Sequence, residues 1–247
     1  MKFQMSAPMM LLAAAAALVG CGPDSNPGQS PSESPGTAAA VESTDGAPGG
    51  TGTQGADADP HTASSFTVVV NKHNPLDPED YVPANLADIE GHQLRQEAAD
   101  ALRTMLSDMR AEGVNVNITS AYRSYDTQVS TYDHWVQQNG QAAADRVSAR
   151  PGFSEHQTGL AVDLADGSGC DLQVCFEQTP AAEWAMENAA EYGFVLRFPD
   201  GMESVTGYSY EPWHFRYVGA DQAQGIQASR FSTLEEYYGT GAAPDYR

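Results

Sequence analysis

The chain has 247 residues and a formal net charge of -21, with 12 Lys and Arg residues against 33 Asp and Glu residues. Binding to nucleic acid phosphates needs clustered basic side chains, so this balance argues against a nucleic-acid partner. An acidic surface also has no electrostatic attraction to anionic lipid. Apolar residues make up 41% of the chain, which is enough for one sizeable core.

The N-terminus resembles an export signal. An apolar run over residues 9–19 follows Lys2 and is too short to form a stable transmembrane helix. It ends in Leu18-Val19-Gly20-Cys21, which resembles a lipobox in which Cys21 is lipid-modified and becomes the first mature residue. The alternative is an ordinary signal peptide with an incidental cysteine. We expect residues 1–20 to be a lipoprotein signal peptide, and the protein to be exported and lipid-anchored to the outer face of the bacterial cytoplasmic membrane.

The next segment has the composition of a linker. Gly, Pro, Ser, Thr, Ala and Asp dominate residues 22–64, and large apolar residues are nearly absent. Such a segment cannot bury enough apolar surface to offset the entropy lost on folding. We therefore expect a disordered tether over residues 21–64 and a single folded domain over residues 65–247.

The first elements of this domain follow from hydrophobic periodicity. Residues 66–70 (Phe-Thr-Val-Val-Val) predict a strand. Apolar residues at three- and four-residue spacing from Leu94 to Met109 predict a helix that begins near residue 85 or 92 and ends at 112, before Gly113. Residues 114–119 alternate between apolar and polar side chains, which predicts a second strand.

Capping residues place the later elements. Ser124 can cap a helix that Gly140 ends, and Thr179-Pro180 opens another helix that Gly193 ends. Residues 194–198 and 213–218 are expected to form a pair of strands. Helices and strands mix without regular βαβ alternation, so the predicted fold class is α+β.

Two cysteines lie in the predicted domain, Cys170 and Cys175, with four residues between them. An exported protein meets an oxidising environment, so we expect these residues to form a local structural disulfide. A metal site would be the alternative in a cytosolic protein, but no further cysteine supports it.

Candidate metal ligands occur first in residues 154–164. Leu160, Val162 and Leu164 point one way along a predicted strand, whereas Asp163 points the other way. An aspartate in such a strand costs free energy unless it is paired or bound to a cation. Gly159 permits a turn that brings His156 back toward Asp163, so the two side chains can share one metal ion.

A second candidate segment is Tyr210-Glu211-Pro212-Trp213-His214. His214 would supply a third ligand, and two histidines with one carboxylate form a catalytic zinc arrangement that leaves a position for water. Glu211 lies three residues before His214, with a rigid proline between them. It is well placed to act as general base on a metal-bound water molecule.

Arg123 is a third candidate, because it directly follows a predicted strand, where an active-site loop would begin. A fixed cation can polarise the scissile carbonyl and stabilise the oxyanion that develops on it. A surface salt bridge is an equally good interpretation of its position alone.

Together these segments resemble the VanY-type D-alanyl-D-alanine carboxypeptidases, within the zinc peptidase group that includes the VanX dipeptidases. The resemblance runs from about residue 70 to residue 237. It rests on Ser-x-His-x-x-Gly-x-Ala-x-Asp at residues 154–163 and Glu-x-Trp-His at residues 211–214. Ala121 departs from the family pattern, which usually has glycine before Tyr-Arg-Ser.

The resemblance implies a small antiparallel sheet flanked by helices, as in Hedgehog and D,D-peptidase zinc folds. It also implies one Zn²⁺ per chain, bound by His156, Asp163 and His214, with Glu211 as the base and Arg123 as the oxyanion-stabilising group. Gln128 and Ser148 would contact the substrate. The expected reaction is hydrolysis of the terminal D-Ala-D-Ala bond of peptidoglycan stem peptides by a monomer that meets the membrane only through its N-terminal lipid.

Two other functions fit the same residues. An L,D-carboxypeptidase or a peptidoglycan endopeptidase would use the same zinc site. Hedgehog signalling domains have a similar zinc scaffold without peptidase activity, so a non-catalytic zinc-binding wall protein is also possible. The presence of both Glu211 and Arg123 favours catalysis.

The lipobox generates a prediction about localisation. Replacing Cys21 by serine removes the thiol that would carry the lipid, so Cys21→Ser should release the protein from membranes into the medium. One acyl chain holds a protein on a membrane only weakly, so stable anchoring needs two or more chains. Membrane fractionation of both forms measures this. A wild-type protein that is already soluble would contradict the lipoprotein assignment.

Overall fold

The computed structural model describes residues 58–247, so the predicted signal peptide, Cys21 and most of the predicted tether lie outside the described residues. Residues 58–64 already belong to the fold. The Asp59 N–H donates to Thr67 Oγ1 at 2.8 Å, the Val69 N–H donates to the Pro60 carbonyl at 2.9 Å, and Ala63 is buried. The folded structure therefore extends further toward the N-terminus than the predicted boundary at residue 65.

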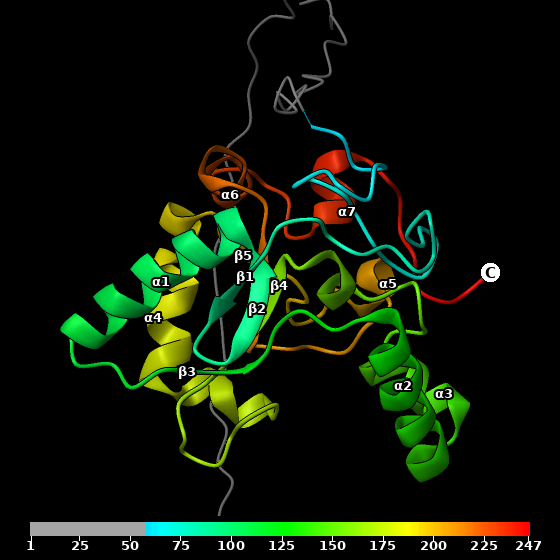
Figure 1. The fold of residues 1–247 in the computed structure, drawn as a ribbon, viewed down its shortest axis with the longest axis horizontal. Coiled ribbons are helices and arrows are strands. Elements are labelled where there is room, and N and C mark those ends of the chain that lie inside the picture. The colour runs from blue at the N-terminus through cyan, green and yellow to red at the C-terminus, as the bar shows by residue number, and fades with distance from the viewer. Residues whose placement is uncertain (1–57) are drawn as a thin grey trace, which may run out of the picture. The chain divides into compact units, whose positions relative to one another are not determined.

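Two antiparallel sheets and seven α-helices make up the described residues (Figure 1). The strands are β1 (Leu86–Ile89), β2 (His92–Arg95), β3 (Asn117–Ser120), β4 (Ala161–Ala165), β5 (Phe194–Leu196) and β6 (His214–Tyr217). The helices are α1 (Gln96–Ala111), α2 (Tyr125–Asn139), α3 (Gln141–Val147), α4 (Pro180–Asn188), α5 (Glu203–Thr206), α6 (Ala220–Gln227) and α7 (Leu234–Tyr238). Three short 3₁₀ segments are η1 (Glu155–Thr158), η2 (Val174–Gln178) and η3 (Ala189–Tyr192). The predicted α+β class is confirmed. In this part of the chain no helix combines the length and apolar character that a membrane span needs.

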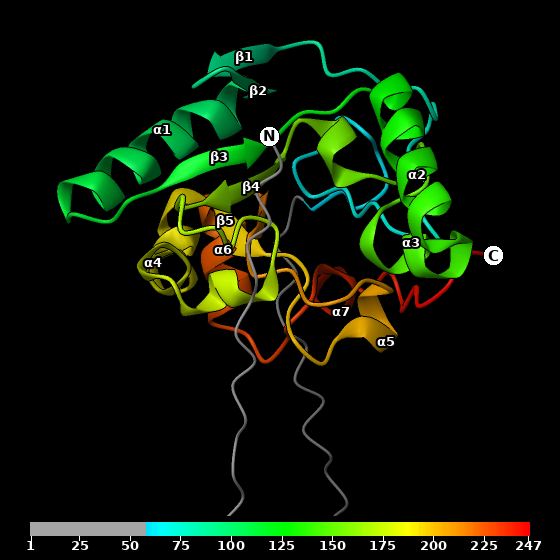
Figure 2. The same cartoon turned by 90° about the horizontal axis from the view of Figure 1, so that it is seen from below.

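The main sheet has the strand order β3-β4-β6-β5 and separates two environments. Val162 and Leu164 of β4 and Phe215 of β6 point into a core that they share with α1 and α4. These two helices lie on one side of the sheet, and α2 and α3 lie on the other (Figures 1 and 2). Because side chains alternate along a strand, Asp163 and His214 face away from the α1–α4 core. The sheet thus carries its polar residues on the side of α2 and α3.

The predicted helix start at residue 85 or 92 is wrong, because residues 86–95 form the β1–β2 hairpin. Glu90 and Gly91 join the two strands, and both have positive φ, at 50° and 86°. Two such residues form a tight turn whose twist suits a hairpin. The helix α1 then begins at Gln96 and buries the periodic apolar residues that predicted it, from Ala98 to Met109.

The strand predicted over residues 66–70 is also absent from the structure. Val68, Val69 and Val70 are buried as expected, but their segment pairs with no strand. Instead, the Arg216 guanidinium donates to the carbonyl oxygens of Phe66 and Val68, at 3.0 and 2.8 Å. A buried side chain here takes the place of a neighbouring strand. The predicted strand at 114–119 is shifted, and β3 covers residues 117–120.

The capping predictions are confirmed. Ser124 Oγ accepts from the Thr127 N–H at the start of α2, and Gly140 follows its last residue. Thr179 Oγ1 accepts from the Ala182 N–H at the start of α4, and Gly193 ends the η3 segment in the left-handed region. The strand pair β5–β6 is antiparallel as predicted. Four short helices, α3, α5, α6 and α7, have no counterpart among the predicted elements.

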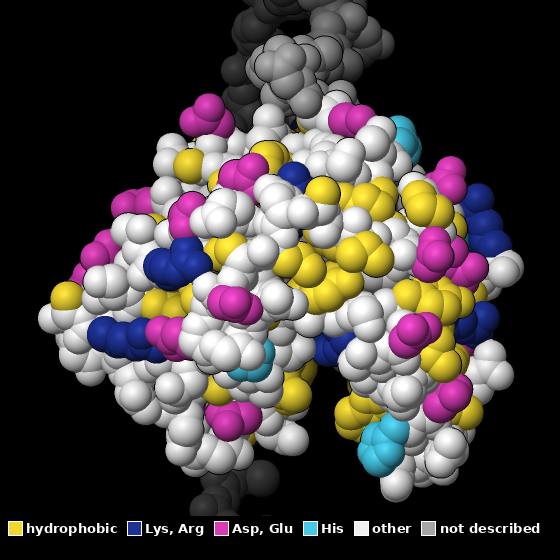
Figure 3. Space-filling view, in the orientation of Figure 1, with side chains coloured by type: hydrophobic (Ala, Val, Ile, Leu, Met, Phe, Trp, Pro, Cys, Tyr) yellow, Lys and Arg dark blue, Asp and Glu magenta, His cyan; other side chains and the backbone are white. Residues whose placement is uncertain are grey.

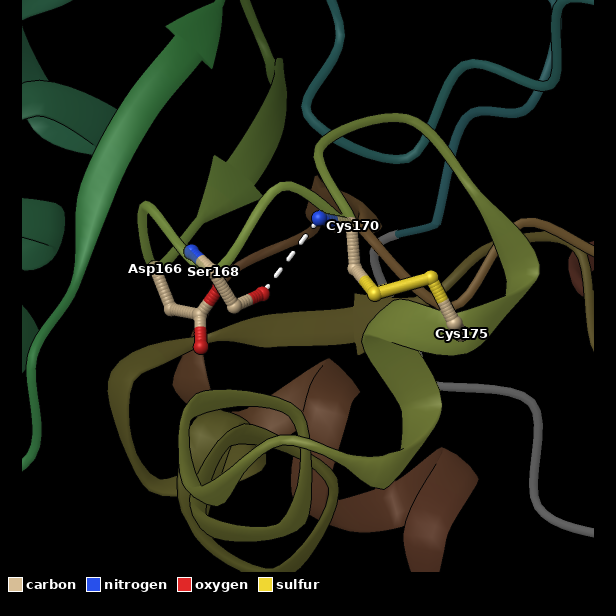
Figure 4. The surroundings of a disulfide bond; sticks show 4 residues. All are labelled: Asp166, Ser168, Cys170 and Cys175. Atoms are coloured by element: carbon tan, nitrogen blue, oxygen red, sulfur yellow. Dashed lines mark hydrogen bonds between the residues drawn. A yellow bond between two sulfur atoms is a disulfide. The ribbon is translucent and has the colours of Figure 1, made fainter. Parts of the chain in front are cut away.

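The Cys170–Cys175 disulfide is present in the loop that follows β4 (Figure 4). The Cys170 N–H donates to Ser168 Oγ at 3.3 Å, which closes a turn just before the bridge. On the other side, Phe176 of η2 is fully buried in the main core. The loop is therefore fixed at both ends, while its middle residues are exposed.

This disulfide should stabilise the fold modestly. Closing so short a loop removes little entropy from the unfolded chain, and the Cys170→Ser/Cys175→Ser variant should lose about 2 kcal/mol of unfolding free energy. Denaturant titration of both forms measures the difference. Mass spectrometry after alkylation without reductant should find both thiols blocked in the wild-type protein, and two free thiols would contradict the bridge.

Candidate active site

Three potential metal ligands meet on the polar side of the main sheet. His156 lies in η1, Asp163 in β4 and His214 in β6. Asp163 and His214 are direct cross-strand partners, so both side chains leave the sheet on the same face. His156 Nε2 lies 3.2 Å from Asp163 Oδ2, and His214 Nδ1 lies 2.9 Å from Asp163 Oδ1. One ligand atom from each residue lies within 4.8 Å of the other two.

The turn at Gly159 brings His156 to this position. Gly159 has a φ of 67°, in the left-handed region that favours glycine, and ends η1. A Cβ at this position would lie only 3.2 Å from the Arg95 backbone nitrogen. The predicted turn, which reverses the chain between His156 and Asp163, is therefore confirmed by the structure.

Hydrogen bonding prepares the histidines to bind a metal. The Ala121 carbonyl oxygen lies 2.7 Å from His156 Nδ1 and can only accept, so Nδ1 carries the hydrogen and Nε2 keeps its lone pair toward Asp163. His214 directs Nδ1 toward Asp163, and its Nε2 faces the Glu155 carboxylate at 3.7 Å. Metal-bound histidines commonly donate their second N–H to a carbonyl or carboxylate. The donor set and its surroundings fit a zinc ion.

Burial and close contact between oppositely charged groups determine the pKa values of Asp163 and His214. Although burial opposes ionisation, contacts with His156 and His214 hold the pKa of Asp163 below its usual range. Burial also disfavours charged His214, but the nearby carboxylates of Asp163 and Glu155 outweigh it and raise its pKa to about 9. The three groups are thus strongly coupled, as expected where carboxylates and imidazoles converge on a cation position.

Glu211 lies beside this group, and its Oε2 is 3.7 Å from His214 Nδ1. Burial raises the pKa of Glu211 to about 8, although His214 acts in the opposite direction. A carboxylate whose pKa is close to neutral pH can both accept and return a proton. The Glu211 backbone N–H donates to the Phe198 carbonyl, and the His214 N–H donates to the Glu211 carbonyl. The segment is therefore fixed as the spacing of Glu211 and His214 predicted.

Arg123 enters the same cavity from the loop between β3 and α2. Its guanidinium donates to Gln128 Oε1 at 2.9 Å and to Ser120 Oγ at 3.0 Å. Gln128 is fully buried and is not among the residues that line the cavity, and it helps to position Arg123. Its contact with the substrate stays a prediction. Ser148 does line the cavity, and Gln128 Nε2 donates to its Oγ at 3.4 Å.

The cavity has a volume of about 450 Å³ and contains all five central residues. His156, Asp163 and His214 lie in its wall together with Glu211 and Arg123. A ligand in the cavity would therefore meet the potential metal ligands, a carboxylate and a guanidinium at once. This is the composition that metal-assisted hydrolysis of a carbonyl compound requires.

Sequence reasoning missed a buried ion cluster behind the site. Glu155 Oε1 accepts from Arg197 at 2.8 Å and from Arg216 at 2.7 Å. Arg197 also forms two hydrogen bonds with the Glu235 carboxylate, at 2.9 and 2.6 Å, and Asn71 Nδ2 donates to the same group. These four charged side chains are almost completely buried. The available signal was an arginine in each of two apolar strand segments, because a charge in such a place needs a partner.

The second oxygen of Glu155 links this cluster to the potential ligands. Glu155 Oε2 has no hydrogen-bond partner within the described residues, and it faces His214 Nε2, which also has none, at 3.7 Å. Burial opposes its ionisation, but Arg197 and Arg216 hold the pKa of Glu155 well below its usual range. An ionised Glu155 favours the tautomer of His214 that carries hydrogen on Nε2 and leaves Nδ1 free for a metal ion.

Comparisons with known proteins agree with the family resemblance found in the sequence. A family model described as VanY, D-alanyl-D-alanine carboxypeptidase, matches residues 91–220. The bifunctional D-Ala-D-Ala dipeptidase and D-Ala-D-Ala carboxypeptidase VanXYC of Enterococcus gallinarum is 37% identical, over 69% of this chain and 92% of that protein.

Two solved structures are also similar. The L,D-carboxypeptidase DacB from Streptococcus pneumoniae is 42% identical, with a TM-score of 0.60 over 72% of this chain and 89% of that one. A mutant of the vancomycin resistance D,D-pentapeptidase VanY, in complex with Zn(II), is 32% identical, with a TM-score of 0.61 over 70% of this chain and 98% of that one.

The ion cluster allows a matched test of Glu155. Glu155→Gln and Glu235→Gln each leave Arg197 short of one carboxylate, so both should destabilise the fold, by about 3 kcal/mol or more. Only Glu155 faces His214, so only Glu155→Gln should weaken zinc binding, by about 10- to 100-fold. Chelator competition measures the affinity and thermal unfolding the stability. Equal zinc affinity in the two variants would show that Glu155 has no part in orienting His214.

Proposed function

The chain belongs to the VanY family of D-alanyl-D-alanine carboxypeptidases, and from this premise we propose that it is a zinc-dependent D,D-carboxypeptidase acting on peptidoglycan stem peptides. The observation that carries this proposal is the meeting of His156, Asp163 and His214 in one cavity with Glu211 and Arg123. Family membership supports a hydrolase of peptide bonds.

Zinc would be held by His156 Nε2, one oxygen of Asp163 and His214 Nδ1. When bound in such a site, zinc lowers the pKa of a coordinated water molecule and polarises the carbonyl that is attacked. The similar VanY structure is described as a complex with Zn(II). In this chain the fixed Nδ1–H of His156 and the Glu155 carboxylate behind His214 support the same assignment.

Glu211 would transfer protons, and Arg123 would stabilise the negative charge that develops on the carbonyl oxygen. Glu211 accepts a proton from the attacking water molecule and then delivers it to the amine of the departing residue, so water is consumed and one amino acid is released. Arg123, held by Gln128 and Ser120, retains further N–H groups that can donate to the carbonyl oxygen as it becomes negative. Both groups are in place before substrate arrives, which reduces the reorganisation needed during the reaction.

One observation favours L,D-carboxypeptidase activity as a second candidate. The L,D-carboxypeptidase DacB is 42% identical to this chain, whereas the D,D-pentapeptidase VanY is 32% identical. Both activities release a terminal D-alanine and differ in the residue before the scissile bond. The proposed chemistry at Glu211 and Arg123 is the same in either case, so the stem peptide that is cleaved distinguishes them.

We also propose that the enzyme works outside the cell, where peptidoglycan lies. The lipobox ending at Cys21 supports lipid anchoring, and the linker composition of residues 22–57 would let the catalytic domain reach the wall. The Cys170–Cys175 disulfide agrees with an oxidising compartment.

The division of roles predicts two different failures. Glu211→Gln keeps size and polarity but cannot accept a proton, so it should bind near-stoichiometric zinc and release D-alanine about 100- to 10,000-fold more slowly. His214→Ala should lose zinc and activity together. Metal content and D-alanine release are measured on the same preparations.

The substrates for this assay are stem peptides of defined length. Release from a pentapeptide ending in D-Ala-D-Ala reports D,D activity, and release from a tetrapeptide ending in a single D-Ala reports L,D activity. Wild-type protein that binds zinc but cleaves neither peptide would contradict the proposed function. Zinc loss in Glu211→Gln would instead make Glu211 a ligand or a support for one.

A further inference from the structure

Exposed apolar side chains in the described residues are concentrated around the cavity. Six large hydrophobic residues are exposed in this part of the chain, and four of them line the cavity. The four are Trp135 of α2, Val147 of α3, and Leu172 and Val174 of the disulfide loop. An apolar group at a cavity edge is stabilised when a ligand covers it, so this distribution points to a binding surface.

These residues form two opposite walls. Figure 3 shows the surface hollowed between two lobes at its lower edge, with hydrophobic side chains on both sides of the hollow. In the same orientation, α2 and α3 lie on one side and the loop between β4 and α4 on the other (Figure 1). Trp135 and Val147 therefore belong to one wall, and Leu172 and Val174 to the other.

The loop that carries Leu172 and Val174 is built to keep them outside the core. The Cys170–Cys175 bridge closes its base, and Phe176 anchors it in the main core. Leu172 has a φ of 55°, in a region that non-glycine residues rarely adopt. Its side chain is nevertheless 43% exposed. The Gln173 N–H donates to the Cys170 carbonyl at 3.0 Å, so Leu172 is the third residue of a tight turn that directs its side chain outward.

Charge divides the cavity into two zones. Among the residues that line it, Arg123 is the only lysine or arginine, and it lies in the same part as Glu211 and the potential metal ligands. The walls formed by Trp135 and the disulfide loop carry no charged side chain in the lining. The reacting end of a peptide suits the charged zone, so the walls are left for an uncharged, aliphatic portion of the same molecule.

The proposed substrate class has one such portion. The two terminal D-alanines carry only methyl groups, whereas the third residue of a stem peptide is a diamino acid with a long aliphatic chain. It lies at the scissile bond in an L,D reaction and next to it in a D,D reaction. Its amino group can extend beyond the apolar walls to solvent, as lysine side chains commonly do.

Resting on the proposed function, we propose that Leu172 and Val174 form a specificity-determining subsite for the aliphatic side chain of the third stem-peptide residue. The Cys170–Cys175 disulfide holds the subsite in place, and Trp135 and Val147 form its opposite wall. The subsite selects substrates without taking part in the chemistry at Glu211. It therefore acts on peptide affinity and leaves the rate of the bound complex unchanged.

Two matched pairs of peptides test the subsite. Each pair contains L-Lys or Gly as the third residue, one pair as pentapeptides ending in D-Ala-D-Ala and one as tetrapeptides ending in D-Ala. Wild-type protein should prefer the lysine peptide by about 10-fold in kcat/KM, since burial of a few methylene groups contributes on that scale. Leu172→Ser/Val174→Ser should lose this preference through a higher KM for the lysine peptide, with kcat unchanged.

The control is Val82→Ser/Met186→Ser, which removes the two exposed apolar side chains that do not line the cavity. It should keep the wild-type preference. A Leu172→Ser/Val174→Ser variant that also keeps the preference would overturn the subsite while the proposed function stands. Wild-type protein that releases D-alanine from none of the four peptides would overturn the proposed function, and the subsite with it.

The disulfide is tested separately with Cys170→Ser/Cys175→Ser, with circular dichroism confirming that the variant is folded at the assay temperature. This variant should lose the lysine preference as the loop variant does, although it retains Leu172 and Val174. A folded variant that keeps the wild-type preference would overturn the role of the disulfide in holding the subsite.

Discussion

An ionised carboxylate in a protein interior persists only where cations and hydrogen-bond donors surround it, and Glu155 meets this condition with Arg197 and Arg216. Its other oxygen faces His214, so the same carboxylate contacts both the buried arginines and one of the potential metal ligands. The cluster extends through Glu235 to α7 and through Arg216 to the backbone near residue 66. Segments that are distant in sequence are thereby fixed relative to the potential zinc ligands.

This arrangement explains why a small sheet can hold a site of this kind. The strands β4 and β6 contain only five and four residues, and each exposes one face to an apolar core. Burying Asp163 and His214 on the opposite face would be costly if their polar atoms lacked partners. His156, which the Ala121 carbonyl fixes, contacts Asp163, and the Glu155 carboxylate faces His214. Asp163 Oδ1 and His214 Nε2 still lack a hydrogen-bond partner among the described residues, which fits a site where a cation would complete the pairing.

The sequence allowed much of the candidate site to be predicted, because short-range spacing is easy to read. The turn at Gly159, the alternation around Asp163 and the step from Glu211 to His214 are all local, and the structure brings these residues together. The resemblance to a known family implied that the two segments meet in one site, because spacing alone does not place β4 beside β6. The resemblance implies substrate contact for Gln128, which stays a prediction, whereas its burial beside Arg123 depends on long-range packing that spacing does not reveal.

The errors in the fold have a similar cause. The apolar periodicity of α1 also fits the residues before it, but a two-residue turn at Glu90 and Gly91 makes them a hairpin. Residues 66–70 have the composition of a strand. Their carbonyl groups, however, accept hydrogen bonds from Arg216, which lies 150 residues from Phe66 in the sequence. Non-local partners of this kind leave no periodic signal. The ion cluster around Glu155 escaped prediction for the same reason.

The strand order also separates two kinds of change. The ligand-bearing strands β4 and β6 are the two central strands of the main sheet, each hydrogen-bonded on both sides. The cavity walls come from α2, α3 and the loop after β4, all outside the sheet. Substitutions, insertions or deletions in the walls can therefore reshape the entrance while the spacing of the potential metal ligands stays constant. A fold organised in this way can diversify in the peptides it accepts without having to rebuild its chemistry.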